Sequence, residues 1–163
     1  MILYSSELFD SNCVTLVRKR QKNSSNTNIY ISPSIGLILY KPTVSYVNEK
    51  YLVFQYNKTE HLSLLSLFRR ISDNLSSIVK GTFFDLQNKH IYTVHSEQES
   101  TFTIRVSLPG SNKKYFVATN WGPFRLPRVG AIYDRVTIEF KNYWEKDDLI
   151  GMNTELKKLE SNN

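Results

Sequence analysis

Apolar and polar positions alternate with a period of two over most of the chain. This period is typical of strands with one buried face, and seven segments show it: residues 43–47, 51–56, 82–86, 90–94, 101–108, 113–119 and 135–144. Two further apolar runs, at 13–17 and 29–31, flank a stretch rich in Asn and Ser at 19–28. Because Asn and Ser favour turns, we expect this stretch to be a hairpin or another connection between strands.

One segment has the period of an amphipathic helix instead. Its apolar positions are spaced by four and three residues and form a single stripe: Leu64, Phe68, Ile71, Leu75 and Ile78. At its start, Asn57 and Glu60 have the spacing of a capping box. At its end, Gly81 suits the left-handed conformation that often terminates helices. The sequence therefore predicts one long helix over about residues 59–80.

Strand alternation separates an interior face from an open face in segments 101–108 and 135–144. The interior positions are apolar: Phe102, Ile104, Val106, Leu108, Val136, Ile138 and Phe140. The opposite positions, continued back to residue 133, are mostly polar: Thr101, Thr103, Arg105, Ser107, Tyr133, Arg135, Thr137, Glu139, Lys141 and Tyr143. Trp144 ends its segment on the interior side of the alternation, so we expect its ring to be buried.

Length and composition fit one domain that spans residues 1–163. With 163 residues and 40% hydrophobic content, the chain can bury one ordinary core without disulfides or a structural metal. Several short strands and a single helix predict a β-rich α+β fold with mostly antiparallel pairing.

Three features of the sequence bear on its cellular location. The single cysteine, Cys13, excludes an internal disulfide and fits a reducing compartment. The first residues lack a basic region followed by a long apolar run, so we expect no secretory signal. No stretch approaches the roughly 20 apolar residues that span a bilayer, so no membrane partner is expected. These features favour an intracellular, cytoplasmic protein.

Net charge narrows the class of partner. The chain has 21 Lys and Arg against 15 Asp and Glu, a net charge of +6, and acidic residues outnumber basic ones only after residue 128. Such a balance indicates a polyanionic partner, for example a nucleic acid, or else a modestly basic solvated surface.

Cations and aromatic residues are interleaved in the segment 113–130, which two prolines interrupt. In grooves that bind single-stranded nucleic acid, cations track the phosphates and aromatic rings stack on unpaired bases. The predicted phosphate contacts are Lys113, Lys114, Arg105, Arg125, Arg128 and Arg135, and the predicted stacking residues are Trp121, Phe124 and Tyr133. The competing interpretation is that the rings fill a core while the cations are solvated.

A second group of cations lies in the predicted connection near the N-terminus. Lys19, Arg20 and Lys22, together with the preceding Arg18, place four positive charges within five residues. A loop of this kind either closes over a bound strand or only aids solubility, and the sequence leaves both interpretations open.

The sequence lacks the motifs of common catalytic and metal sites. His61, His90 and His95 do not have the spacing of metal ligands. The adjacent Asp147 and Asp148 are better explained as a polar turn between strands than as a metal site. No phosphate-binding glycine loop, dinucleotide fingerprint or nucleophile elbow is found. We therefore expect a protein that is not an enzyme and holds neither cofactor nor metal.

The arrangement after residue 100 resembles that of a known protein family. Its order is TFTIRVSLP, then the basic and aromatic segment, then VTIEFKNYWEKDDLIGMNTELKKL. With Arg105 before a Leu-Pro stop, Trp144 at a strand end and Gly151 opening a last strand, this order resembles the single-stranded DNA-binding proteins of large cytoplasmic DNA viruses and related linear plasmids. The resemblance covers roughly the last 60 residues. It implies an open five-stranded barrel of the oligonucleotide-binding type and non-specific coating of unpaired DNA.

These observations predict a modified oligonucleotide-binding antiparallel barrel with the 59–80 helix at one end. The predicted function is binding of single-stranded DNA, largely without sequence preference, in viral or plasmid DNA replication. The alternative from another class is a viral or plasmid-encoded interaction module whose aromatic patch binds a host or replication protein. RNA is a third partner to test, because no residue here discriminates the 2′-hydroxyl group. The oligomeric state stays open.

Overall fold

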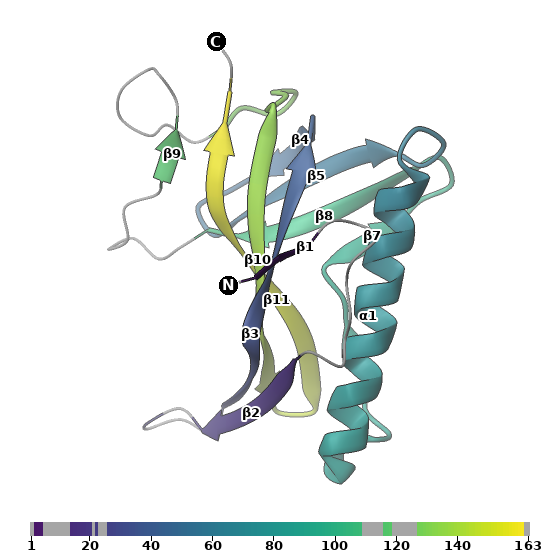
Figure 1. Ribbon diagram of the computed structural model, residues 1–163, viewed down its shortest axis with the longest axis vertical. Coiled ribbons are helices and arrows are strands. Elements are labelled where there is room, and N and C mark those ends of the chain that lie inside the picture. The colour runs from purple at the N-terminus through teal and green to yellow at the C-terminus, as the bar shows by residue number, and fades with distance from the viewer. Residues whose placement is uncertain are drawn as a thin grey trace.

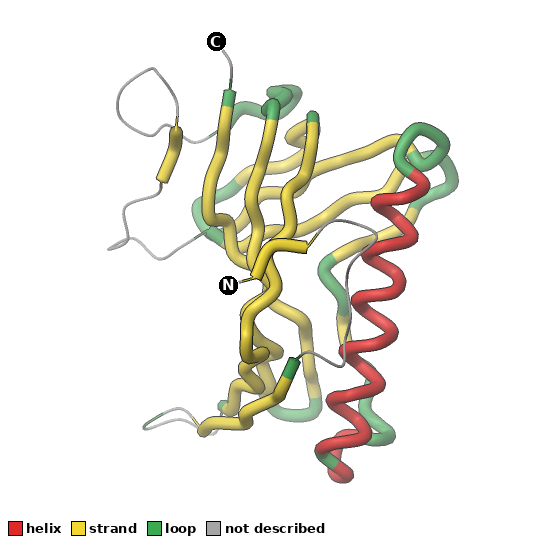
Figure 2. Tube along the Cα trace, in the orientation of Figure 1, coloured by secondary structure: helices red, strands yellow, loops and turns green. Residues whose placement is uncertain are grey.

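The computed structural model describes residues 2–4, 14–20, 22, 26–108, 116–118 and 127–161. Within these residues, eleven strands form one curled sheet, and one long α-helix lies beside it (Figures 1 and 2). The prediction of a β-rich α+β fold is therefore confirmed.

The elements follow one another along the chain with the helix between the fifth and sixth strands. The strands are β1 (Ile2–Tyr4), β2 (Thr15–Arg20), β3 (Thr27–Tyr40), β4 (Thr43–Val47), β5 (Tyr51–Asn57), β6 (Ile91–Tyr92), β7 (His95–Glu97), β8 (Thr101–Ser107), β9 (Phe116–Ala118), β10 (Arg135–Lys146) and β11 (Leu149–Glu160). The helix α1 spans Leu62–Thr82, and a 3-10 turn, η2, spans Phe84–Leu86. Most predicted strands are present, and the antiparallel pairing of β2 with β3 confirms the predicted connection between them.

The sheet is mixed and open. Its main path runs β1-β3-β10-β11-β8-β5-β4. The long ladders are antiparallel, whereas β1 pairs with β3 and the short β6 and β9 pair with β11 in parallel. A single bridge between Thr43 and Ile132 links β4 to the segment that leads into β10. The described strands therefore approach closure at this point without forming the continuous ladder of a barrel.

Two strands of twelve residues, β10 and β11, hold the sheet together. They pair with each other along their whole length, and β10 also pairs with β3. In Figure 1, β4, β5 and β8 run across the upper part of these strands. Only one residue pair, Ser107 with Glu155, joins β8 to β11 before the two diverge. The space that opens there is filled by β6, which pairs with β11, and by β7, which pairs with β8.

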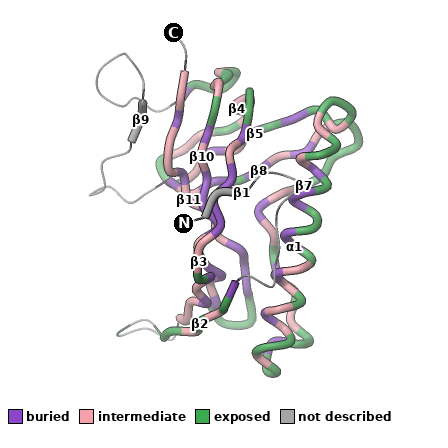
Figure 3. Tube along the Cα trace, viewed as in Figure 1, coloured by how far each residue is buried: buried purple, intermediate pink, exposed green. Residues whose placement is uncertain are grey.

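The core lies between the sheet and α1. All seven interior positions predicted on β8 and β10 and at Leu108 are buried. The apolar stripe of the helix is buried at Phe68, Ile71 and Leu75, and the Phe68 ring lies 5.7 Å from that of Phe140. Figure 3 shows buried segments through the centre of the sheet, while α1 alternates between buried and exposed segments. None of the described helices combines the length and apolar character that a membrane span requires.

The start of the helix differs from its prediction. Helix α1 begins at Leu62, three residues after the predicted start, with His61 as its N-cap residue. The Asn57 side chain accepts hydrogen bonds from the backbone N–H groups of Thr59 at 2.9 Å and Glu60 at 3.4 Å. Asn57 therefore stabilises the turn that precedes the helix instead of capping the helix itself, because Asn side chains bond equally well to nearby backbone groups outside helices.

The end of the helix also differs from its prediction. Gly81 remains helical, and the last hydrogen bond runs from the N–H of Phe83 to the carbonyl of Val79 at 2.9 Å. The strand predicted at 82–86 is wrong, since the helix and η2 occupy these residues. Leu86 is fully buried there. A short apolar run fits a helix end as well as a strand, so periodicity alone did not separate the two.

A β-bulge in β10 changes which side chains face the core. Phe140 and Asn142 pair with Thr154 and Asn153, which are consecutive on β11, so one extra residue stands between them on β10. An extra residue reverses the alternation. Tyr143, predicted on the open face, is consequently fully buried. Trp144, predicted to be buried, is only partly buried and lies on the opposite face.

Candidate functional site

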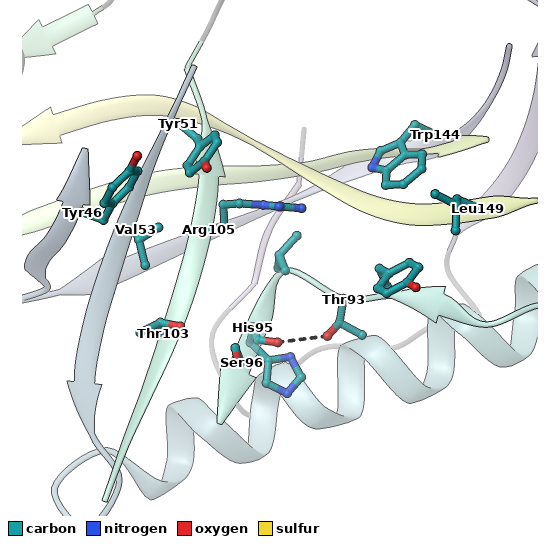
Figure 4. A pocket seen from close by; sticks show the side chains of 12 residues that line it. Tyr46, Tyr51, Val53, Thr93, His95, Ser96, Thr103, Arg105, Trp144 and Leu149 are labelled. Carbon is teal, nitrogen blue, oxygen red and sulfur yellow. Dashed lines mark hydrogen bonds between the residues drawn. The ribbon is translucent and has the colours of Figure 1, made fainter. Parts of the chain in front are cut away.

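A groove of about 660 Å³ opens over the sheet near the point where β8 and β11 diverge (Figure 4). Twelve residues from seven strands and one connection line it: Tyr46, Tyr51, Val53, Tyr92, Thr93, Val94, His95, Ser96, Thr103, Arg105, Trp144 and Leu149. We call this feature the aromatic groove. Its volume lies within the range of about 300–1,000 Å³ that small-ligand sites occupy.

Among the described residues that line the aromatic groove, Arg105 carries the only full charge. It lies on the exposed side of β8, as the alternation predicts. Its guanidinium carbon is 5.8 Å from the ring centroid of Tyr51, which is within cation–π range. No carboxylate is found among the described lining residues, and no described carboxylate forms an ion pair with Arg105. This guanidinium group is therefore available to an anionic ligand.

Aromatic rings stand on both sides of Arg105 in the aromatic groove. On one side, the rings of Tyr46 and Tyr51 are 5.8 Å apart and tilted by 31°. On the other side lies Trp144, and Figure 4 shows the Arg105 side chain extending from the two tyrosines toward it. Tyr46 and Tyr92 are each about half exposed. The groove thus presents two aromatic walls around one cation.

Gly151 determines how the Trp144 ring sits. The two residues are directly opposite each other on β10 and β11. A Cβ atom at position 151 would lie 2.5 Å from Nε1 of Trp144 and closer still to two of its ring carbons. Only glycine leaves room for the indole to lie against the strand at this position. One ring face therefore covers the backbone, and the other is left for the aromatic groove.

A polar cluster behind the groove joins β7 to α1. The Nδ1 atom of His95 is 3.4 Å from the Ser72 hydroxyl oxygen, and its Nε2 atom is 3.6 Å from Glu97. Arg69 donates to Glu97 at 3.0 Å, and Lys58 lies 3.4 Å away. The Arg69 hydrogen bond lowers the pKa of Glu97 to about 2, and burial lowers the pKa of His95.

This cluster has the residue types of a catalytic triad but not its accessibility. The Ser72 hydroxyl belongs to a residue that is 3% exposed and faces away from solvent inside the packing of α1. The carboxylate of the cluster, Glu97, is already paired with Arg69 and Lys58. The cluster therefore serves to anchor β7, since a nucleophile must be reachable by substrate. Within the described residues, no group of three or more metal-ligating side chains could hold a metal ion.

A row of amides crosses the sheet beside the aromatic groove. Ser107 donates to Asn153 at 2.8 Å, Asn153 donates to Asn142 at 3.1 Å, and Asn142 donates to Asn28 at 3.3 Å. These four residues belong to β8, β11, β10 and β3. None of the three asparagines was predicted to be part of a site, although Asn142 lies inside the predicted strand 135–144, where an Asn is rare and was a signal.

The remaining part of β10 and β11 carries what we call the charge ladder: Arg135, Glu139, Lys141, Glu155, Lys157, Lys158 and Glu160. Arg135, a predicted phosphate contact, donates to Glu160 at 3.0 Å. Lys157 lies 2.9 Å from Glu155 and 3.5 Å from Glu139. The cations of this surface are therefore matched by carboxylates.

The other described residues of the predicted site lie outside the aromatic groove. Arg128 is exposed in the turn before β10. Tyr133 is half-buried against the core, and burial raises its pKa, so its ring is less available for stacking than predicted. Lys19 and Arg20 lie exposed on β2, and Lys22 is exposed in the following turn. The predicted residues Lys113, Lys114, Trp121, Phe124 and Arg125 lie outside the described residues.

Arg18, which the sequence groups with the cations of β2, has a structural role. It donates to Glu145 of β10 at 2.6 and 2.8 Å and to Asp85 of η2 at 2.9 and 3.0 Å. Its guanidinium group also lies 5.3 Å above the Phe83 ring. The hydrogen bonds raise the pKa of Arg18 and lower that of Asp85. This side chain fastens β2 to β10 and η2 and is not available to a ligand.

Comparisons with known proteins add no assignment to this geometry. No protein-family model matches the chain, and no curated protein shows significant sequence similarity to it.

Proposed function

We propose that the protein binds single-stranded nucleic acid in the aromatic groove and does so without catalysing a reaction. The observation that carries this proposal is the position of Arg105, which has no carboxylate partner among the described residues and lies between two aromatic walls. A guanidinium group pairs with phosphate, and aromatic rings stack on any unpaired base. The groove therefore suits a flexible polyanion whose bases are exposed.

The ligand that we propose is unpaired DNA in viral or plasmid replication. The net charge of +6 and the resemblance after residue 100 support it. Duplex is a poorer ligand, because its bases are stacked on one another and cannot reach the walls. We also propose that the fold is of the oligonucleotide-binding barrel type. The binding itself does not depend on a closed barrel, because a curved open sheet is sufficient to provide the binding face.

Titration of labelled oligo-dT at several salt concentrations tests this function. Arg105→Gln should weaken binding and make the slope of log affinity against log salt less negative by about 0.7, the value for one phosphate contact on a single strand. Arg135→Gln is the matched control, because it removes the same charge from a side chain paired with Glu160 outside the groove. Equal affinities for wild type and Arg105→Gln, or tighter binding of duplex, would contradict the proposal.

A protein partner is the second candidate, favoured by the exposed apolar surface at the rim. Tyr46, Tyr92 and Leu149 are each about half exposed. A hydrophobic protein interface hardly responds to salt, whereas phosphate binding weakens steeply. The same salt titration therefore separates the two functions. Replacing oligo-dT by oligo-U then tests whether the 2′-hydroxyl group matters.

A further inference from the structure

The order of side chains across the aromatic groove is ring, cation, ring. Tyr51 lies on β5, and Arg105 lies on the neighbouring strand β8. The direct partner of Arg105 on β5 is Val53, two residues after Tyr51. Trp144 comes from β10, beyond the gap between β8 and β11. Figure 4 shows Tyr46 and Tyr51 on one side, Trp144 on the other, and the Arg105 guanidinium group reaching from one toward the other.

Each wall offers a ring surface that is fixed in place. The Trp144 indole is held against Gly151, which allows only its outer face to meet a ligand. On the other wall, the Tyr51 ring is held between the tilted ring of Tyr46 and the guanidinium group of Arg105, and the half-exposed ring of Tyr46 offers the free surface. Rings that are already ordered lose little conformational freedom when a base stacks on them.

The smallest nucleic-acid unit with the same order is a dinucleotide. It has two bases and, between them, one phosphodiester with a single negative charge. One nucleotide would leave one aromatic wall uncovered. A longer strand would bring further phosphates, for which the described part of the groove lining has no second cation. The groove volume of about 660 Å³ is that of a small-ligand site.

We infer that the aromatic groove binds one dinucleotide step of a single strand, with one base against Tyr46 and Tyr51, the other against Trp144, and the bridging phosphodiester on Arg105. This inference rests on the proposed function and adds to it the unit that the groove recognises. The rest of a longer strand then lies outside the groove, on other parts of the protein.

Competition against labelled oligo-dT tests the dinucleotide step directly. The competitors are thymidine monophosphate, the dinucleotide TpT, and TpT in which a neutral methylphosphonate replaces the phosphodiester. TpT should compete at least about tenfold better than the methylphosphonate, which loses the hydrogen bond to a charged group. It should also compete better than thymidine monophosphate, which loses one stacked base. Thymidine monophosphate controls for charge, because it carries more charge per base but covers only one wall.

The Arg105→Gln variant locates the phosphodiester. In this variant, TpT and its methylphosphonate analogue should compete equally, whereas Arg135→Gln should preserve their difference. If wild-type protein binds oligo-dT with the expected salt dependence but does not distinguish the three competitors, the dinucleotide step is overturned and the proposed function stands. If oligo-dT itself does not bind, both are overturned.

Discussion

The aromatic groove and the charge ladder both place cations on strands of the same sheet, but only one of them leaves a cation unmatched. In the charge ladder, Arg135 and Lys157 each lie within 3.0 Å of a carboxylate. In the groove, Arg105 has aromatic neighbours, and no described lining residue is a carboxylate. A paired cation must give up its carboxylate before it contacts phosphate, so availability identifies a binding surface better than the number of positive charges does.

Strand β10 contributes to both surfaces, and its bulge separates them. Before the bulge, Arg135 and Glu139 belong to the charge ladder. After the bulge, Trp144 lines the groove. The amide of Asn142 lies at the bulge itself, where it bonds to Asn28 and Asn153. The one extra residue thus changes which side chains at the end of β10 face the groove.

The largest effect is expected where a paired cation is removed from a nearly buried partner. Arg18→Gln should lower the free energy of unfolding by about 2–3 kcal/mol, because the Glu145 side chain, 9% exposed, loses its main counter-charge. Oligo-dT affinity of the folded protein should not change. Urea denaturation of wild type, Arg18→Gln and Arg105→Gln measures this. The groove variant should differ from wild type by less than about 0.5 kcal/mol.

An unchanged urea midpoint for Arg18→Gln would show that Arg18 does not fasten β2 to β10. A loss of oligo-dT affinity without a loss of stability would show that Arg18 contacts the nucleic acid and has no structural role.

The sequence predicts the local elements of this fold well, for physical reasons. Strands β5 and β8 have uninterrupted alternation, and the apolar stripe of α1 is continuous, so short-range patterns are sufficient there. Strand β3 was recognised only at 29–31, because Pro33 and Gly36 interrupt the apolar pattern of a strand that nevertheless continues from Thr27 to Tyr40. A bulge leaves no mark in periodicity, which is why the faces of Tyr143 and Trp144 were exchanged.

The candidate site was less predictable than the fold. Tyr46, Tyr92, Arg105 and Trp144 come from segments far apart in the sequence, and only the register of the sheet brings them together. A search for neighbouring cations and rings selects continuous stretches such as 113–130 instead. Arg105 was identified because its exposure follows from alternation alone. The pairing of Arg135 with Glu160 depends on strand register, which the sequence pattern does not contain.

The second prediction tests the aromatic side of the comparison. Trp144→Ala should weaken oligo-dT binding by about 1–3 kcal/mol, the contribution of one stacked base. Trp144→Phe keeps a ring on Gly151 and should recover part of this affinity. Fluorescence anisotropy of labelled oligo-dT measures both variants. Wild-type affinity in Trp144→Ala would remove this wall from the binding site.

The third prediction concerns the effect of pH on Glu97, a carboxylate near the groove that is paired with Arg69. The Arg69 hydrogen bond lowers the pKa of Glu97 from 4.5 to about 2 on folding. The folded protein therefore binds fewer protons than the unfolded chain between these values, and this stabilisation is present above about pH 4.5 and lost as the pH falls toward 2. For a partly exposed ion pair we expect about 1 kcal/mol.

Urea unfolding of wild type and Glu97→Gln at pH 6 and pH 3 isolates this contribution. The variant should be less stable than wild type at pH 6, and this difference should be smaller at pH 3, which lies between the two pKa values. Oligo-dT affinity at pH 6 should be little affected, since Glu97 does not line the aromatic groove. A constant difference in stability at both pH values would show that the ion pair does not account for the pH dependence.

The smallest effect is expected from the exposed cations of β2 and its turn. Lys19, Arg20 and Lys22 lie outside the groove lining, so a dinucleotide bound at Arg105 does not reach them. Changing all three to Gln should leave TpT competition unchanged and, for long oligo-dT only, make the salt slope less negative by up to about 2.1, at roughly 0.7 per phosphate contact. Stability should change by less than about 0.5 kcal/mol per substitution. Equal losses for TpT and long oligo-dT would mean that these charges act through a general field and that the groove does not define the recognised unit. An unchanged slope for long strands would confine binding to the groove and leave β2 with solubility alone.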